Sequence, residues 1–172
     1  MFRVRCSRCG AEHDLSGIEP AFARPDDFFA VPDSEREQRV SGSDDACLIT
    51  SSDGQRLSCF IRTVLEVPIR GEETSIGWGL WVEVTPEAYR RVGALWEDPT
   101  QDKEPPFPCA LANDLPNYPN TRELRGTMQL TGLHTRPTLI LARDSSHQFA
   151  VESHAGVPFE RALEWRSWFV PH

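Results

Sequence analysis

Near its start, the chain carries two cysteines, a glycine and a histidine at a spacing that suits metal binding. Two residues separate Cys6 from Cys9, Gly10 follows directly, and His13 comes four residues after Cys9. Two thiolates three residues apart on a tight turn can bind one metal ion, and glycine permits the positive φ that such a turn needs. The pattern therefore predicts a metal site, with zinc as the cofactor.

A structural zinc ion needs four ligands in a tetrahedral arrangement. Cys6 and Cys9 supply two of them, and His13 is the nearest candidate for the third. We predict Cys47, at the start of a strand, as the fourth. Cys59 and Cys109 are weaker candidates. Cys59 faces the predicted core, where a free thiol packs as a small apolar group, and Cys109 lies in the proline-rich segment, where either role suits it.

Two other interpretations of the cysteine pair stay open. A redox dithiol would benefit from the neighbouring arginines, which lower a thiol pKa. Such dithiols, however, begin a helix, whereas Gly10 turns the chain away from one. The other interpretation is that Cys6 and Cys9 bind nothing.

Composition limits the range of partners. The net charge is −8, and the chain has a single lysine, Lys103. Phosphate contacts need clustered basic side chains, so we expect no nucleic-acid partner and no anionic membrane surface. Apolar runs such as 139–142 are far shorter than the roughly 20 residues of a spanning helix. An unknown protein or small molecule remains as the partner.

Length and cysteine usage indicate one domain in a reducing compartment. The 172 residues predict a single domain over 1–172, in which residues 1–50 form a metal-binding segment integrated with the sheet. Five cysteines cannot all pair in disulfides, and the N-terminus lacks the apolar core of a secretory signal. Both observations favour a cytoplasmic protein.

Hydrophobic patterning predicts the elements that position these residues. Strict alternation over 57–70 indicates a half-buried strand, and 76–84 is its antiparallel partner. Shorter strands are predicted over 46–50, 127–134 and 137–143. The fold class is α+β: an antiparallel sheet with helices packed on one face and an N-terminal turn like a zinc knuckle.

Three helices are predicted around this sheet. One covers 32–40, one starts at Thr85 and one covers 158–169. In the second, Thr85 is the N-cap, and Tyr89, Val92 and Trp96 form a buried stripe.

A proline-rich segment over 99–126 lies between the sheet strands. We expect residues 105–118 to lie ordered across an edge or face of the sheet, with Phe107 and Tyr118 largely buried.

Histidines near the last two strands invite a catalytic interpretation. His147 follows an aspartate and two serines. A catalytic triad is defined by geometry and not by proximity in sequence, so a surface or packing role is favoured for His147.

The order of several motifs resembles a bacterial family, domain of unknown function 2199. The motifs are Cys6-x-x-Cys9-Gly10-x-x-His13, Asp44-Asp-Ala-Cys47-Leu-Ile49, Phe60-Ile-Arg-Thr-Val-Leu-Glu-Val-Pro-Ile69, Gly77-Trp-Gly-Leu-Trp-Val82, Leu95-Trp-Glu-Asp98, Leu115-Pro-Asn-Tyr-Pro-Asn-Thr121 and His147-Gln-Phe-Ala-Val-Glu152. The resemblance extends from Arg5 to about Trp168. It implies a bacterial, cytosolic, single-domain protein, supports the four predicted ligands as a matched set, and implies no activity.

The chain departs from the family pattern near its end. Gln148 stands where proline is usual, and Ser153 stands where glutamine is common. These departures weaken the segment after His147 as a working site.

Three functions are consistent with these observations. The first is a zinc-stabilised binding or adaptor module. The second is a metal-dependent hydrolase with an open zinc position. The third is an acidic immunity-type inhibitor of a basic toxin. No nucleophile–base pair, phosphate loop or cofactor fingerprint stands out in the sequence. Enzymatic activity is therefore left uncertain, and a role without catalysis is favoured.

Overall fold

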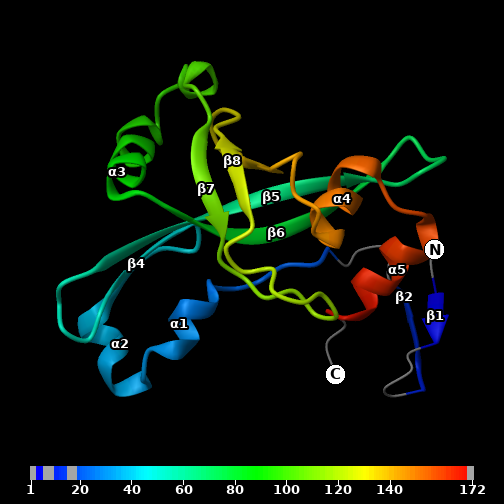
Figure 1. Ribbon diagram of the computed structural model, residues 1–172, viewed down its shortest axis with the longest axis horizontal. Helices are drawn as coiled ribbons and strands as arrows, with labels where there is room; N and C mark the ends of the chain where they lie inside the picture. Colours follow the sequence, from blue (N-terminus) through cyan, green and yellow to red (C-terminus); the bar gives the residue numbers. More distant parts are fainter. Residues whose placement is uncertain (1–2, 6–9, 15–18, 170–172) are drawn as a thin grey trace.

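The structure is a computed structural model that describes residues 3–5, 10–14 and 19–169 (Figure 1). Its strands are β1 (Arg3–Arg5), β2 (Glu12–Asp14), β3 (Val40–Gly42), β4 (Ala46–Thr50), β5 (Leu57–Pro68), β6 (Ser75–Val84), β7 (Phe107–Leu111), β8 (Arg125–Gln129) and β9 (Thr138–Leu141). Its helices are α1 (Asp26–Ala30), α2 (Asp33–Arg39), α3 (Pro86–Leu95), α4 (Gln148–Ala155) and α5 (Phe159–Ser167), with a 3₁₀ turn, η1 (Gln101–Lys103).

The main sheet closes on itself. Strands β3 to β9 pair in chain order, each antiparallel to the next. Strand β9 also returns to β5, where Val64 pairs with Thr138 in parallel. Strands β5 to β9 therefore form a closed five-stranded barrel, from which β4 and β3 continue outward along β5.

The α+β class is correct, and the predicted antiparallel sheet is confirmed in part. The sheet is closed, and its closing contact is parallel. Alternating hydrophobicity gives the buried face of each strand but not which strands meet at the end of the sheet. The helices do not share one face either. Figure 1 shows α3 at one end, α1 and α2 below β4, and α4 with α5 at the opposite end.

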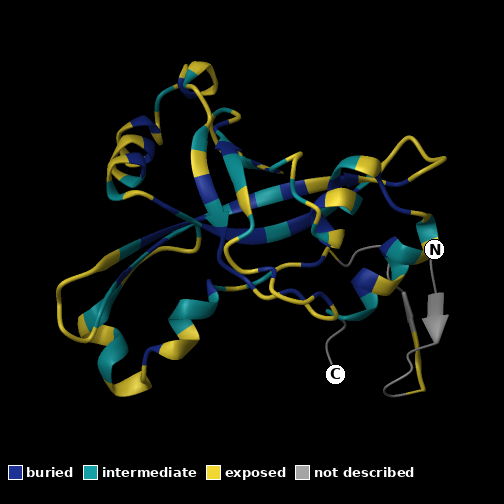
Figure 2. Ribbon diagram, in the orientation of Figure 1, coloured by how far each residue is buried: buried dark blue, intermediate teal, exposed yellow. Residues whose placement is uncertain are grey.

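Two apolar clusters lie on opposite faces of β5. The odd positions of β5 from Cys59 to Val67 are buried, as predicted, whereas Leu57 at the start of the strand is exposed. The apolar ones among them pack with Trp78, Phe149 and Trp165. On the other face, Phe60 packs with Trp81 and Val31. Figure 2 shows β6 as mostly buried along its length. Burial of both faces makes the middle of β5 and β6 the rigid part of the molecule.

Most predicted elements are confirmed, and several described elements were missed, among them β3 and α1. Helices α2, α3 and α5 and strand β4 lie at the predicted places. Strand β7 lies inside the segment that the sequence predicts as a loop, and α4 has no predicted counterpart. Tyr118 is buried as expected, whereas Phe107 is half-buried. No helix within the described residues is long and apolar enough to cross a membrane.

Candidate functional site

The surface is hollowed where β5 passes from one neighbouring strand to another. The amide of Arg62 donates to the carbonyl of Asp45, just before β4, at 2.9 Å. Two residues later, the amide of Val64 donates to the carbonyl of Pro137, just before β9, also at 2.9 Å. Strands β4 and β9 therefore diverge from the same edge of β5. The guanidinium of Arg136 bridges this fork through an ion pair with Asp45, 2.8 Å from Nε to Oδ1.

Helix α3 brings aromatic side chains to the fork. It begins at Thr85, whose hydroxyl accepts a hydrogen bond from the amide of Ala88 at 3.2 Å, as the predicted N-cap requires. Its end is held by Gln101, whose side-chain amide donates to the carbonyls of Leu95 at 3.2 Å and Trp96 at 3.1 Å. Because Gln101 is itself buried, the last turn of α3 and the residue after it are fixed in place.

Trp96 does not face the core, which corrects the predicted buried stripe. Its side chain is 41% exposed, and the buried positions of α3 are Ala88, Val92 and Leu95. Leu95 occupies the inward position that the helical spacing predicts for Trp96. Adjacent residues of a helix point about 100° apart, so a residue next to one at the centre of the buried stripe lies at the edge of the stripe or outside it. The adjacent Leu-Trp pair was the signal that one of them faces outward.

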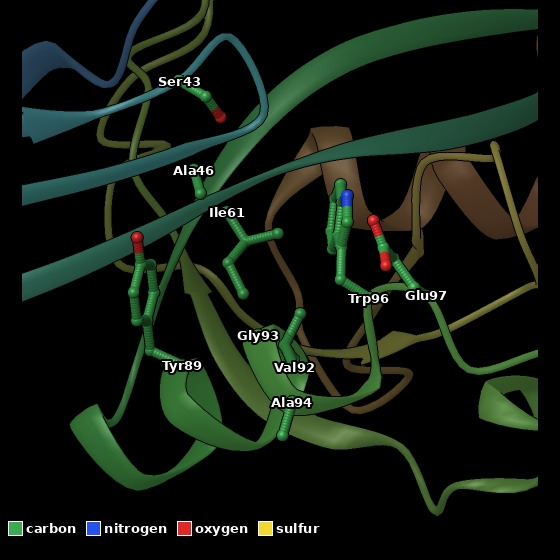
Figure 3. Close-up of a pocket in the computed structure, with 9 residues that line it drawn as sticks. All are labelled: Ser43, Ala46, Ile61, Tyr89, Val92, Gly93, Ala94, Trp96 and Glu97. Atoms are coloured by element: carbon green, nitrogen blue, oxygen red, sulfur yellow. The ribbon is translucent and has the colours of Figure 1, made fainter.

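The first hollow lies between α3 and β5 and has a volume of about 480 Å³. Ile61 and Val92 form its floor, and the rings of Tyr89 and Trp96 stand on opposite sides of Ile61 (Figure 3). Burial raises the pKa of the Tyr89 hydroxyl above its ordinary value. The phenol is therefore neutral at physiological pH and serves as a hydrogen-bonding group at the wall.

The second hollow lies on the other side of Trp96 and has a volume of about 950 Å³. Trp96 and Glu97 line both hollows, so we name the two together the fork cleft. The remaining residues of the second hollow are Asp45, Val64, Glu66, Gln101, Gly132, Leu133, His134, Thr135, Arg136 and Thr138. Together with Glu97, the lining has three carboxylates and one guanidinium. The lining is therefore acidic on balance.

A tight loop over 131–136 forms one wall of the second hollow. The hydroxyls of Thr131 and Thr135 lie 2.8 Å apart, and Thr131 also donates to the carbonyl of Arg136 at 3.1 Å. His134 has a φ of 60°, a backbone conformation that residues other than glycine rarely adopt. The loop therefore holds a histidine in a fixed, exposed position at the wall.

The predicted metal ligands lie elsewhere, and only part of that prediction falls on described residues. Cys6 and Cys9 lie outside the described residues. His13 lies on β2, where it pairs with Val4 of the antiparallel strand β1. Gly10 has a φ of 73°, which confirms the expected positive φ between the two strands. Within residues 3–5, 10–14 and 19–169, no three His, Cys, Asp or Glu side chains are grouped to hold a metal ion.

Cys47, the predicted fourth ligand, lies in an apolar environment. It is 1% exposed on β4, in the cluster with Phe60 and Trp81. Burial raises the pKa of its thiol, because the thiolate would lose its solvation there. Figure 1 places β4 and β2 at opposite ends of the molecule. Its role as a ligand stays a prediction.

Cys59 is buried in the barrel core, as the sequence predicts. Cys109 is also buried, and burial raises the pKa of its thiol to about 12. Both thiols are therefore protonated at neutral pH and pack as small apolar groups.

His147 is the N-cap of α4. Its Nδ1 accepts a hydrogen bond from the amide of Phe149 at 3.1 Å, and its Nε2 lies 2.6 Å from the carbonyl oxygen of Pro119. One ring nitrogen accepts and the other donates, which is the arrangement of a neutral imidazole. His147 thus joins the start of α4 to the proline-rich segment. This contact favours the packing role over a catalytic one.

Near His147, Tyr118 centres a buried polar network. Its hydroxyl donates to Glu152 and accepts from Arg161 at 2.8 Å and from the indole of Trp165 at 3.2 Å. Burial, together with the hydrogen bond to Glu152, raises the pKa of the Tyr118 hydroxyl well above its ordinary value. We name these four residues the Tyr118 cluster.

The closed sheet and its fork define a small mixed α+β domain with an open cleft beside one central strand. The chain belongs to a bacterial family described as an uncharacterized protein conserved in bacteria (DUF2199), whose model matches residues 5–157. The matched range includes the whole fork cleft and stops before α5. Comparisons with curated proteins and with solved structures gave no match.

Proposed function

We propose that this protein is a cytoplasmic binding module that holds its ligand in the fork cleft. The observation that carries the proposal is Trp96, a large aromatic side chain 41% exposed on the partition between two hollows. Ligand sites combine concave apolar walls with a few convergent polar groups. Here Ile61 and Val92 give the apolar floor, while Tyr89 and Glu97 supply polar groups.

The rigidity of the walls supports binding without a large rearrangement. Gln101 fixes the end of α3 from inside the protein. Arg91 and Glu104 add a paired contact, at 2.7 and 2.8 Å, between α3 and the segment after it. A ligand that enters a preformed site pays less entropy on binding.

Several polar groups of the lining are held by other groups of the protein. Asp45 is paired with Arg136, and the hydroxyl of Ser43 accepts from the amide of Asp45 at 3.2 Å. Gln101 is occupied at the end of α3. Asp45, Ser43 and Gln101 are therefore committed to contacts within the protein, whereas Glu97 keeps its carboxylate available to a ligand.

We further propose that zinc stabilises the N-terminal segment. Its proposed ligands are Cys6, Cys9, His13 and Cys47. The antiparallel pairing of β1 with β2 supports a hairpin around the Cys-x-x-Cys turn. Metal content measured by inductively coupled plasma mass spectrometry should fall together with the melting temperature in Cys6→Ser and His13→Ala. Unchanged zinc in Cys47→Ala would remove Cys47 from the set, and zinc-free wild-type protein of equal stability would contradict the zinc proposal.

The binding proposal is tested by a fragment screen. A set of neutral, anionic and cationic small molecules is screened against the wild type and Trp96→Ala by saturation-transfer NMR. Thermal melts confirm that the variant is folded. We expect at least one chemical class to bind the wild type and to lose binding in the variant. If every compound that binds does so equally to both proteins, or if none binds, the fork cleft is not a ligand site.

A further inference from the structure

We propose that the first hollow of the fork cleft binds a small organic ammonium ion between Tyr89 and Trp96. This inference rests on the proposed binding function and names its ligand class. The two rings stand on opposite sides of Ile61, with an open volume of about 480 Å³ around them (Figure 3). The faces of aromatic rings carry negative partial charge and attract cations, above all quaternary ammonium groups.

The floor of the hollow suits the methyl groups of such a cation. Ile61, Val92 and Ala46 line it with aliphatic carbon. A methylated ammonium ion spreads its charge over its substituents, so it gains from apolar contact and from the aromatic walls at once. A primary ammonium ion is more strongly hydrated and would lose more solvation on the same floor.

The charges around the hollow favour a cation over an anion. Glu97 is the charged residue among its described lining residues, and no basic side chain joins it there. No hydrogen bond or ion pair engages Glu97 within the described part of the chain. The carboxylate stands beside Trp96, next to the end of α3, where the helix dipole adds negative partial charge (Figure 3).

The surroundings extend this bias beyond the hollow itself. On the far side of Trp96, Asp45 and Glu66 add two carboxylates, of which Asp45 is neutralised by Arg136. The net charge of the whole chain is −8, which raises the local concentration of small cations near the surface. The two arginines beside the site are paired with carboxylates, Arg136 with Asp45 and Arg24 with Asp44, so the unpaired charge at the first hollow is that of Glu97.

The test compares two ligands of the same shape that differ in charge. Choline chloride and its neutral isostere 3,3-dimethylbutan-1-ol are titrated into the wild type, and affinity is measured from NMR shifts of the Trp96 indole. We expect choline to bind about tenfold more tightly than the alcohol. We also expect its affinity to fall as salt is added, because the attraction to Glu97 is screened.

Two variants assign the effect to residues. Glu97→Gln keeps the shape of the side chain and should weaken choline severalfold without changing the alcohol. Trp96→Leu should abolish choline binding. Glu87→Gln is the matched control, since Glu87 lies on the same helix, outside the hollow, paired with exposed Arg90 at 3.3 Å. Its choline affinity should equal that of the wild type. Thermal melts check that each variant is folded.

The outcomes distinguish the ammonium inference from the proposal that the fork cleft binds a ligand. Equal affinities for choline and the alcohol, no binding of choline, or no effect of Glu97→Gln would overturn the ammonium inference. A neutral or anionic fragment that binds at Trp96 would then leave the binding function standing. Absence of any Trp96-dependent fragment would overturn both.

Discussion

The Tyr118 cluster and the fork cleft contain similar residues that differ in burial and in hydrogen bonding. Each combines a tyrosine, a tryptophan and a glutamate. In the Tyr118 cluster, the tyrosine is 6% exposed and its hydroxyl makes three hydrogen bonds. In the cleft, Trp96 is 41% exposed, and Glu97 has no hydrogen-bond or ion-pair partner among the described residues. Satisfied aromatic and polar groups stabilise a fold, while unsatisfied ones on a rigid wall are available to a ligand. Under the proposed function, the same composition therefore serves two purposes in one chain.

The largest expected effect comes from removing a tryptophan from each region. Trp165 is fully buried, and its ring centroid lies 5.2 Å from that of Trp78. Trp165→Ala should lower the free energy of unfolding by about 3–5 kcal/mol, since it leaves a cavity and breaks the contact with Tyr118. Trp96→Ala should lower it by less than about 1 kcal/mol. Urea unfolding of both variants measures the difference, and equal losses would contradict the contrast between the regions.

A smaller effect is expected when only the hydroxyl of the Tyr118 cluster is removed. Tyr118→Phe leaves the buried indole N–H of Trp165 without its acceptor and should cost about 1–3 kcal/mol of unfolding free energy. Tyr89→Phe is the matched change in the cleft and should cost less than about 0.5 kcal/mol. Chemical denaturation at pH 7 measures both. A Tyr118→Phe variant as stable as the wild type would show that the network contributes nothing.

The raised pKa of Tyr118 makes the free energy of unfolding depend on pH in a known direction. The hydroxyl stays protonated in the folded state above the value of 10.0 that holds for an unperturbed tyrosine. The folded protein then binds more protons than the unfolded chain, so unfolding free energy falls as pH rises beyond about 10. Below pH 10 the contribution is fully present. Tyr118→Phe should show a shallower alkaline decline than the wild type, and parallel curves would contradict the assignment.

A further effect on stability concerns the N-cap of α4. His147→Ala removes the acceptor for the amide of Phe149 and should cost about 1 kcal/mol. His147→Asn restores an N-cap acceptor without the contact to Pro119, so it should recover most of the loss. Thermal denaturation measures the stability of the two variants. If the asparagine variant is no more stable than the alanine variant, the contact with Pro119 matters more than the cap.

The sequence predicted local structure better than the closure of the fold. Alternation placed β5 and β6 correctly, and Thr85-Pro86 marked the start of α3, because both signals are local. The single parallel contact between Val64 and Thr138 joins distant strands and has no local signal. The fork cleft depends on that contact, so it could not be found from the sequence.

Errors in the predicted site have similarly physical causes. Trp96 was assigned to the core because it continues a helical spacing that Leu95 satisfies as well. Helix α4 is short and has no strong apolar stripe, and its N-cap is a histidine, which is not among the usual N-cap residues. The Cys-x-x-Cys turn was the strongest motif in the sequence, yet the cleft contains none of its residues.

The most direct test of the central claim follows the tryptophan indoles individually. The protein is labelled with ¹⁵N at the indole nitrogens, resonances are assigned with single Trp→Phe variants, and Trp96-dependent fragments are titrated. A ligand in the fork cleft should shift the Trp96 resonance and leave those of Trp78 and Trp165 unchanged, since both are fully buried. Fragments that bind without shifting Trp96, or that shift only the buried indoles, would contradict the claim that the fork cleft is the functional site.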